Sequence, residues 1–138
     1  MTHFMVWVPG KAAPQGSKKG FVINGKAILV DSSEGNKAWR KLVTETIKAD
    51  QDYIRYSGPV NVSLTFWMEK AKSNKTKHMA QKPDIDKLSR SVLDAMTDSE
   101  IIEDDSRVIY LTVTKRWAEP DDYMPGVLIH VWQDKENA

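Results

Sequence analysis

The segment from Pro83 to Asp105 constrains the fold more than any other part of the chain. It contains two aspartates separated by one residue, an apolar pattern of helical spacing, and two adjacent aspartates before a β-branched run. Pro83 disfavours helix at the residue before it, so we expect Asp84 just ahead of a helix and Asp86 in its first turn. Residues two apart share a face in extended chain but not on a helix. This boundary therefore allows both carboxylates to converge on one cation.

Taken alone, these acids also suit an ordinary structural role. One aspartate would cap the helix and complement its dipole, while Asp86, Arg90 and Asp94, spaced by four, would form an exposed ion-pair ladder. The surroundings favour a functional site. Residues 94–105 hold six acids and no Lys or Arg, whereas residues 70–82 hold five lysines and one histidine. Carboxylates suit Mg²⁺ or Mn²⁺ and lysines suit a polyanion, which together fit metal-assisted phosphodiester cleavage.

These residues resemble the core of the RusA family of Holliday-junction resolvases. The family's helix start, helix end and Asp-Asp before a strand are matched by Pro83-Asp84-Ile85-Asp86-Lys87-Leu88, Leu93-Asp94-Ala95-Met96 and Ile101-Ile102-Glu103-Asp104-Asp105-Ser106-Arg107-Val108. The resemblance is strong from about Pro83 to Lys115. It is weaker at residues 8–11 and 14–18, which resemble the family's first strand and basic loop. The combined spacing is specific, whereas two aspartates with one residue between them are a very weak signal.

The resemblance implies a set of roles by position. Asp84, Asp86 and Asp105 would hold the metal, and Arg90 would replace the family's functional lysine. Lys87 stands where the family has asparagine, which is a second departure. Arginine keeps the charge of lysine but presents it differently. The resemblance further implies Mg²⁺ (or Mn²⁺) without an organic cofactor, and a homodimer that offers two equivalent sites to a four-way junction.

Two basic segments are candidates for contacts with the DNA backbone. Residues 11–20 should form a loop punctuated by Gly and Pro, and residues 70–82, which have no apolar periodicity, should form a second loop. By sequence alone, residues 11–20 are better explained as a solvated surface loop, and only the family resemblance favours DNA contact there. For residues 70–82 a solubilising loop is the alternative, but their position just before the aspartates favours phosphate binding. In the nuclease interpretation, phosphates are bound by Lys18, Lys19, Lys72, Lys75, Lys77, Lys82 and Lys87. Such binding is salt-sensitive because it releases counterions.

The remaining patterns predict the fold. Strands are expected over residues 4–8, 60–68, 108–113 and 127–132, with a hairpin at Asn24-Gly25. Asp31 to Glu34 resemble a capping box before a helix, and residues 119–122 should form a turn. The almost wholly apolar run at 108–113 predicts a buried central strand that supports Asp105. The order indicates one domain, residues 1–138, of α+β class: a two-layer sandwich with a mixed sheet and two main helices.

Composition limits the remaining functional classes. The net charge of the 138 residues is only +1, so nucleic-acid binding must depend on local patches. The chain has no cysteine, which excludes disulfides and thiolate metal sites and fits a reducing cytoplasm. We expect neither a membrane span nor a signal peptide, because the chain has no long apolar run and its first residues do not resemble a signal sequence.

Two other functions compete with the nuclease. A non-catalytic DNA-binding or regulatory protein of the same fold needs no convergent carboxylates, which repel phosphate unless a cation lies between them. A Ca²⁺-binding module is disfavoured, because the sequence contains no loop of alternating oxygen ligands with a central glycine and a terminal glutamate.

Overall fold

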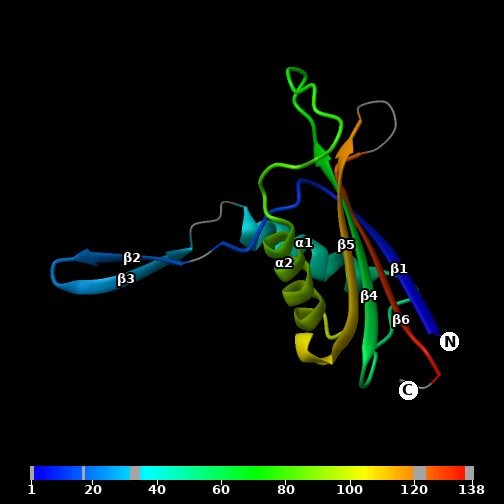
Figure 1. The fold of residues 1–138 in the computed structure, drawn as a ribbon. Coiled ribbons are helices and arrows are strands. Elements are labelled where there is room, and N and C mark those ends of the chain that lie inside the picture. Colours follow the sequence, from blue (N-terminus) through cyan, green and yellow to red (C-terminus); the bar gives the residue numbers. More distant parts are fainter. Residues whose placement is uncertain (1, 17, 32–34, 120–123, 136–138) are drawn as a thin grey trace.

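A four-stranded sheet and two helices on one of its faces form the two layers of the molecule (Figure 1). The structure, a computed structural model, describes residues 2–16, 18–31, 35–119 and 124–135. The strands of the sheet lie in the order β1 (Thr2–Pro9), β6 (Gly126–Gln133), β4 (Val60–Glu69) and β5 (Val108–Ala118). β1 and β4 run antiparallel to β6, and β5 runs parallel to β4. The mixed sheet and two helices confirm the predicted α+β sandwich.

A hairpin of β2 (Lys18–Ile23) and β3 (Lys26–Asp31) forms a separate two-stranded sheet, which extends away from the rest of the chain (Figure 1). Its turn is at Asn24 and Gly25, as predicted, and both residues have positive φ, of 52° and 76°. Such turns match the twist of the flanking strands. Lys18 and Lys19 lie in β2 and not in the preceding loop, which corrects that part of the prediction.

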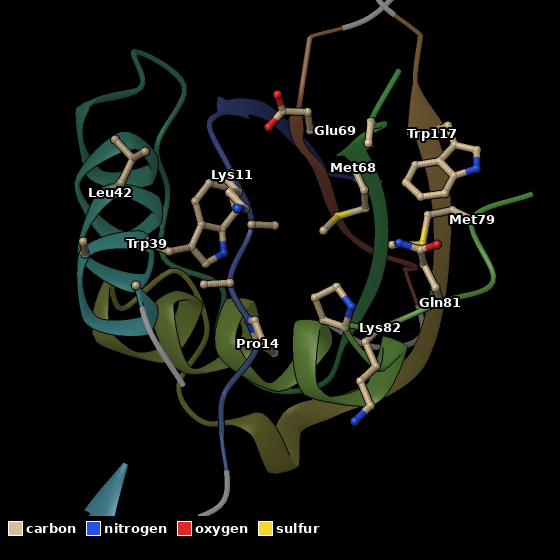
Figure 2. Close-up of a pocket in the computed structure, with 16 residues that line it drawn as sticks. Lys11, Pro14, Trp39, Leu42, Met68, Glu69, Met79, Gln81, Lys82 and Trp117 are labelled. Atoms are coloured by element: carbon tan, nitrogen blue, oxygen red, sulfur yellow. The ribbon is translucent and has the colours of Figure 1, made fainter. Parts of the chain in front are cut away.

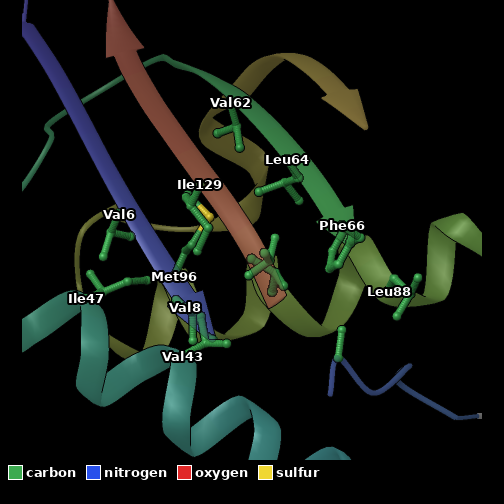
Figure 3. Close-up of a cluster of buried hydrophobic side chains, with 14 of the residues drawn as sticks. Val6, Val8, Val43, Ile47, Val62, Leu64, Phe66, Leu88, Met96 and Ile129 are labelled. Atoms are coloured by element: carbon green, nitrogen blue, oxygen red, sulfur yellow. The ribbon is translucent and has the colours of Figure 1, made fainter. Parts of the chain in front are cut away.

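The core lies between the helices and the inner face of the sheet. Alternate residues of β1 and β4, among them Val8, Leu64 and Phe66, are fully buried, and they face Val43 of α1 (Asn36–Ala49) and Leu88 of α2 (Ile85–Asp98) (Figure 3). Burying an aliphatic side chain of this size contributes about 1.5–3 kcal/mol. This packing fixes both helices, and with them the candidate site residues on α2.

The boundary before α2 is where the sequence places it. Asp84 is the N-cap residue with extended backbone (φ −65°, ψ 140°), and Asp86 lies in the first turn. The Lys82–Pro83 peptide bond is cis. Asp84 makes no side-chain hydrogen bond to the helix start. The capping role that competes with a functional role for this carboxylate is therefore not realised.

β5 differs from the prediction. It is an edge strand bonded to β4 alone, and Ile109, Tyr110 and Leu111 are 61%, 51% and 41% exposed. The apolar run predicted burial on both faces, but composition does not distinguish the centre of a sheet from its edge. Asp105 precedes β5 in a short 3-10 helix, η1 (Asp105–Arg107).

The capping box at residues 31–34 is also wrong. Asp31 ends β3, and the N-cap of α1 is Gly35, whose φ of 76° suits glycine. Glycine has no side chain with which to cap the helix. Residues 32–34 lie outside the described residues, as do 120–123, which include most of the turn expected at 119–122. Within the described ranges, neither helix has the length and apolar character that crossing a bilayer requires.

Candidate active site

A hollow of about 550 Å³ lies between α2 and the start of β5. Asp86 and Arg90, one turn apart on α2, meet Asp105 of η1 there. Ile85 and Leu111, which are 40% and 41% exposed, give it apolar walls. Two of the three predicted metal ligands and the predicted catalytic cation therefore line one open depression, although they come from segments about twenty residues apart.

The adjacent aspartates of η1 have different partners. Asp104 accepts a hydrogen bond from the Ser106 backbone N–H at 2.9 Å and caps η1, and its bonds with Ser106 lower the pKa of its carboxyl. Asp105 instead lies against α2, where the Thr97 hydroxyl donates a hydrogen bond of 2.7 Å to Asp105 Oδ1. One oxygen of Asp105 is thus oriented by α2. Asp104 is therefore engaged within η1, whereas Asp105 lines the hollow.

Asp94 adds a further carboxylate to this side of α2. Burial raises the pKa of its carboxyl, and the nearby Asp105 raises it further, while the Arg40 guanidinium opposes both. Arg40 Nη1 lies 3.7 Å from Asp94, and Arg40 makes a bidentate pair with Asp98, with bonds of 2.6 and 3.0 Å. The structural alternative drawn from the sequence placed Asp94 in a solvated ladder with Arg90. In the described residues its cation is Arg40 of α1, which no sequence spacing indicates.

Asp84 stands apart from the hollow. Its Oδ2 lies 3.7 Å from Lys87 Nζ, one turn further along α2. Within the described ranges, no group of three or more Asp, Glu, His or Cys side chains is arranged to hold a metal ion. Mg²⁺ is commonly held by one or two carboxylates, with water and substrate phosphate completing its coordination. Asp86 and Asp105 fit that donor set.

The start of α2 is anchored by a residue that sequence reasoning missed. Lys115 of β5 donates from Nζ to the carbonyl oxygens of Gln81 and Pro83, at 2.7 and 2.9 Å. The Gln15 backbone N–H donates to the Lys87 carbonyl at 3.0 Å and holds the loop after β1 against the same turn. The only sequence signal for Lys115 is that it ends the family resemblance. These bonds fix the position of the segment that carries Asp84 and Asp86.

The predicted DNA-binding lysines lie in the loop before α2, in the first turn of α2 and on the β2–β3 hairpin. Lys72, Lys75 and Lys77 are exposed in the loop between β4 and α2, and Lys82 is exposed directly before Pro83. Lys87 is half-buried beside Asp84. Lys18 and Lys19 lie on the β2–β3 hairpin, and the described structure does not extend to their side chains.

Comparison with known proteins gives one finding. The model of the family described as endodeoxyribonuclease RusA matches residues 9–131, which include every residue of the candidate site. No curated protein matches the chain.

Proposed function

Because the chain belongs to the RusA family of endodeoxyribonucleases, which act on Holliday junctions, we propose that it is a Mg²⁺-dependent nuclease that nicks paired strands of branched DNA in recombination and repair. Mn²⁺ is a chemically equivalent cofactor for such oxygen ligands. The chain has no cysteine and therefore forms no disulfide. This composition supports a role in the reducing cytoplasm.

The observation that carries the proposal is the meeting of Asp86, Arg90 and Asp105 in one hollow. A protein that only binds DNA has no need of two carboxylates beside the phosphates, because their charges repel. The same carboxylates attract a divalent cation, which reverses the local charge toward phosphate. The arrangement therefore suits cleavage better than binding alone.

The roles we assign follow from position and charge. Asp86 and Asp105 hold Mg²⁺, and Asp84, on extended backbone at the helix start, is the third candidate ligand. A bound Mg²⁺ supplies an activated water and stabilises the charge that develops on the phosphate. Arg90 neutralises part of that charge from the side of the hollow. Thr97 keeps Asp105 oriented through its hydrogen bond.

We also propose that the protein works as a homodimer on four-way junctions. Two symmetry-related sites present the same chemistry to two related strands. The exposed lysines Lys72, Lys75, Lys77 and Lys82 then bind the DNA backbone on the approach to the site, together with Lys18, Lys19 and Lys87. Light scattering of the free protein measures this assembly, and a monomer that nicks both strands would contradict it.

The decisive experiment compares two DNA substrates and two metal conditions. A four-way junction and a linear duplex of the same sequence are incubated with the protein in Mg²⁺, and in EDTA. We expect paired nicks in the junction with Mg²⁺, none with EDTA, and little cleavage of the duplex. A preparation that binds the junction tightly but nicks nothing in Mg²⁺ or Mn²⁺ would instead support the non-catalytic alternative.

A further inference from the structure

A second hollow, which we call the indole pocket, lies beside the start of α2 and has a volume of about 800 Å³. Five segments form its walls: the loop after β1, the first turns of α1, the end of β4, residues 79–83 and the end of β5. Trp39 lies on one side of the pocket, and Trp117 and Met68 lie across from it (Figure 2). The volume is in the range of pockets that bind small organic groups.

The two indoles carry polar groups that lack partners. Trp39 and Trp117 are only 4% and 7% exposed, and neither Nε1 has an acceptor among the residues that the structure describes. Figure 2 places the Trp39 nitrogen on the side of the ring toward the pocket. A buried N–H without an acceptor is unfavourable. An occupant that is flat, aromatic and rich in acceptor atoms would satisfy this donor while its faces pack against the apolar walls of the pocket.

The rim of the pocket is charged. Lys11 and Lys82, both exposed, reach it from two different loops, and Glu69 is the acid at its edge. Lys70 Nζ lies 6.0 Å from the centroid of the Trp117 ring. Two lysines beside an apolar, aromatic interior suit a ligand with an anionic part outside and an aromatic part inside. A nucleotide of a DNA strand has this division, with its phosphate next to its base.

The pocket is also fixed in relation to the carboxylates. Lys82 and Pro83 line its wall, and Asp84 follows them directly. Lys115 donates hydrogen bonds to the carbonyl oxygens of Gln81 and Pro83, and the Gln15 backbone N–H donates one to the Lys87 carbonyl oxygen. A strand held in the pocket is thereby held at a constant distance from the site that we propose for cleavage.

We propose that the indole pocket takes one unstacked nucleobase of the strand whose backbone passes the carboxylates. The proposal rests on the nuclease function proposed above. A hollow with apolar and aromatic walls stabilises a base of single-stranded DNA on a protein with little dependence on sequence. Extrusion of a base costs unpairing and unstacking energy, and this cost is lower at the crossover of a junction, where stacking is interrupted, than inside a regular duplex. The pocket therefore contributes to recognition of branched DNA and sets which phosphate is presented.

The test fills the pocket without disturbing the core. Ala38 is exposed, lines the pocket and lies on α1, so Ala38→Phe places an aromatic side chain in the space for the base. The matched control is Ala49→Phe, an exposed alanine on the same helix about 16 Å further along its axis. Ala71→Phe, from an exposed residue of another wall, repeats the test if Ala38→Phe lowers the thermal midpoint.

The ligand is a short strand of abasic nucleotides that carries a single base, compared with the same strand without any base. Affinities are measured without metal, by quenching of tryptophan fluorescence. We expect the base to strengthen binding about five- to a hundredfold in the wild type and in Ala49→Phe. Ala38→Phe should lose this gain. A base that adds no affinity in the wild type, or whose gain survives in Ala38→Phe, overturns the proposal.

Cleavage of junctions that lack one base at successive positions separates the pocket from the nuclease. Removal of the bound base should slow wild-type nicking, and Ala38→Phe should be indifferent to it, because coupled changes are not additive. A wild type that nicks every such junction equally overturns the pocket alone. A wild type that binds the single base but nicks no junction overturns the nuclease function and supports the pocket.

Discussion

The carboxylate hollow and the indole pocket flank the same helix start but are built in opposite ways. The hollow takes its functional groups from residues 86–105 and leaves them exposed or half-buried at the surface. The pocket takes its walls from five segments between residues 11 and 117, and its aromatic side chains are buried. Substitutions in the hollow should therefore change chemistry more than stability. Segments that link the two regions should change where chemistry occurs.

The largest effect should come from the neighbouring aspartates of η1. Asp105→Asn keeps the acceptor for Thr97 but removes a charge that a hard cation requires. We expect Mg²⁺-dependent nicking to fall about a thousandfold or more, which is the scale of removing a main electrostatic group from a site. Metal-free junction affinity and thermal midpoint should be kept, since a carboxylate that repels its neighbours is relieved when neutralised.

Asp104→Asn is the control for that prediction. It weakens the charged cap of η1, so the thermal midpoint should fall slightly while nicking stays close to wild type. Single-turnover cleavage and thermal melting of the two variants decide the matter. If Asp105→Asn cleaves like wild type, or Asp104→Asn loses as much activity, the division of roles between these aspartates is wrong.

The next effect concerns the lysines that approach both regions. Replacement of Lys72, Lys75 and Lys77 by Ala removes three exposed cations from the loop before α2. If each contacts a phosphate, the slope of log affinity against log salt should flatten by about 2–3, with binding weakened at least tenfold at moderate salt. Fluorescence anisotropy of a labelled junction over a salt series measures both quantities. An unchanged slope would show that the segment only solubilises the chain.

A smaller effect should follow from loosening the link between the regions. Lys115→Met removes the two bonds to the carbonyls of Gln81 and Pro83 but keeps a long side chain. Because a misplaced reacting group costs rate while affinity depends on many contacts, we expect nicking to slow about tenfold with nearly unchanged metal-free junction affinity. Arg116→Met removes a positive charge from the next residue, which is exposed. This variant should nick junctions at close to the wild-type rate. Equal effects of the two variants would indicate a general loss of charge.

The regions also differ in how far sequence predicted them. The aspartates of the hollow lie in one short segment, so their spacing and the family resemblance predicted them. The boundary between extended chain and helix at Asp84 and Asp86 depends on neighbouring residues and was predicted in the same way. Lys115, Arg40 and Trp39 make contacts with residues far away in the sequence. No periodic pattern in the sequence indicates such contacts. The same limit explains β5: its apolar run predicted burial, but whether a strand lies at the centre or the edge depends on which strands pair. The mixed sheet and the hairpin were predictable because each depends on local alternation or on a turn.

The smallest expected effect tests the electrostatics behind the hollow, where Arg40 faces Asp94 and Asp98 of α2 and lowers the pKa of both, but burial outweighs this effect at Asp94. Burial raises the pKa of Asp94, whereas the Arg40 hydrogen bond lowers that of Asp98. A raised carboxyl pKa means that the folded state favours the proton, so this contribution to stability is present below the ordinary pKa and is lost as pH rises through the raised value. A lowered pKa has the opposite sign: its contribution is present above the ordinary pKa and is lost as pH falls through the lowered value.

Asp94→Asn should therefore match or exceed the thermal midpoint of the wild type at pH 7, and lose that advantage in acid. Asp98→Asn should lower the midpoint at pH 7, and the deficit should shrink below about pH 4, where the carboxyl begins to take up its proton in the unfolded chain. Both groups are largely solvated, so screening keeps each shift below about 4 °C, which is the scale of 1 kcal/mol in a chain of this length. Melting curves of the three proteins between pH 3 and 8 measure the differences. Both variants could instead be destabilised at pH 7 and converge on the wild type in acid. Arg40 would then stabilise both carboxylates equally, and Asp94 would be part of the ion pair of Arg40 and Asp98 and not of the site at Asp105.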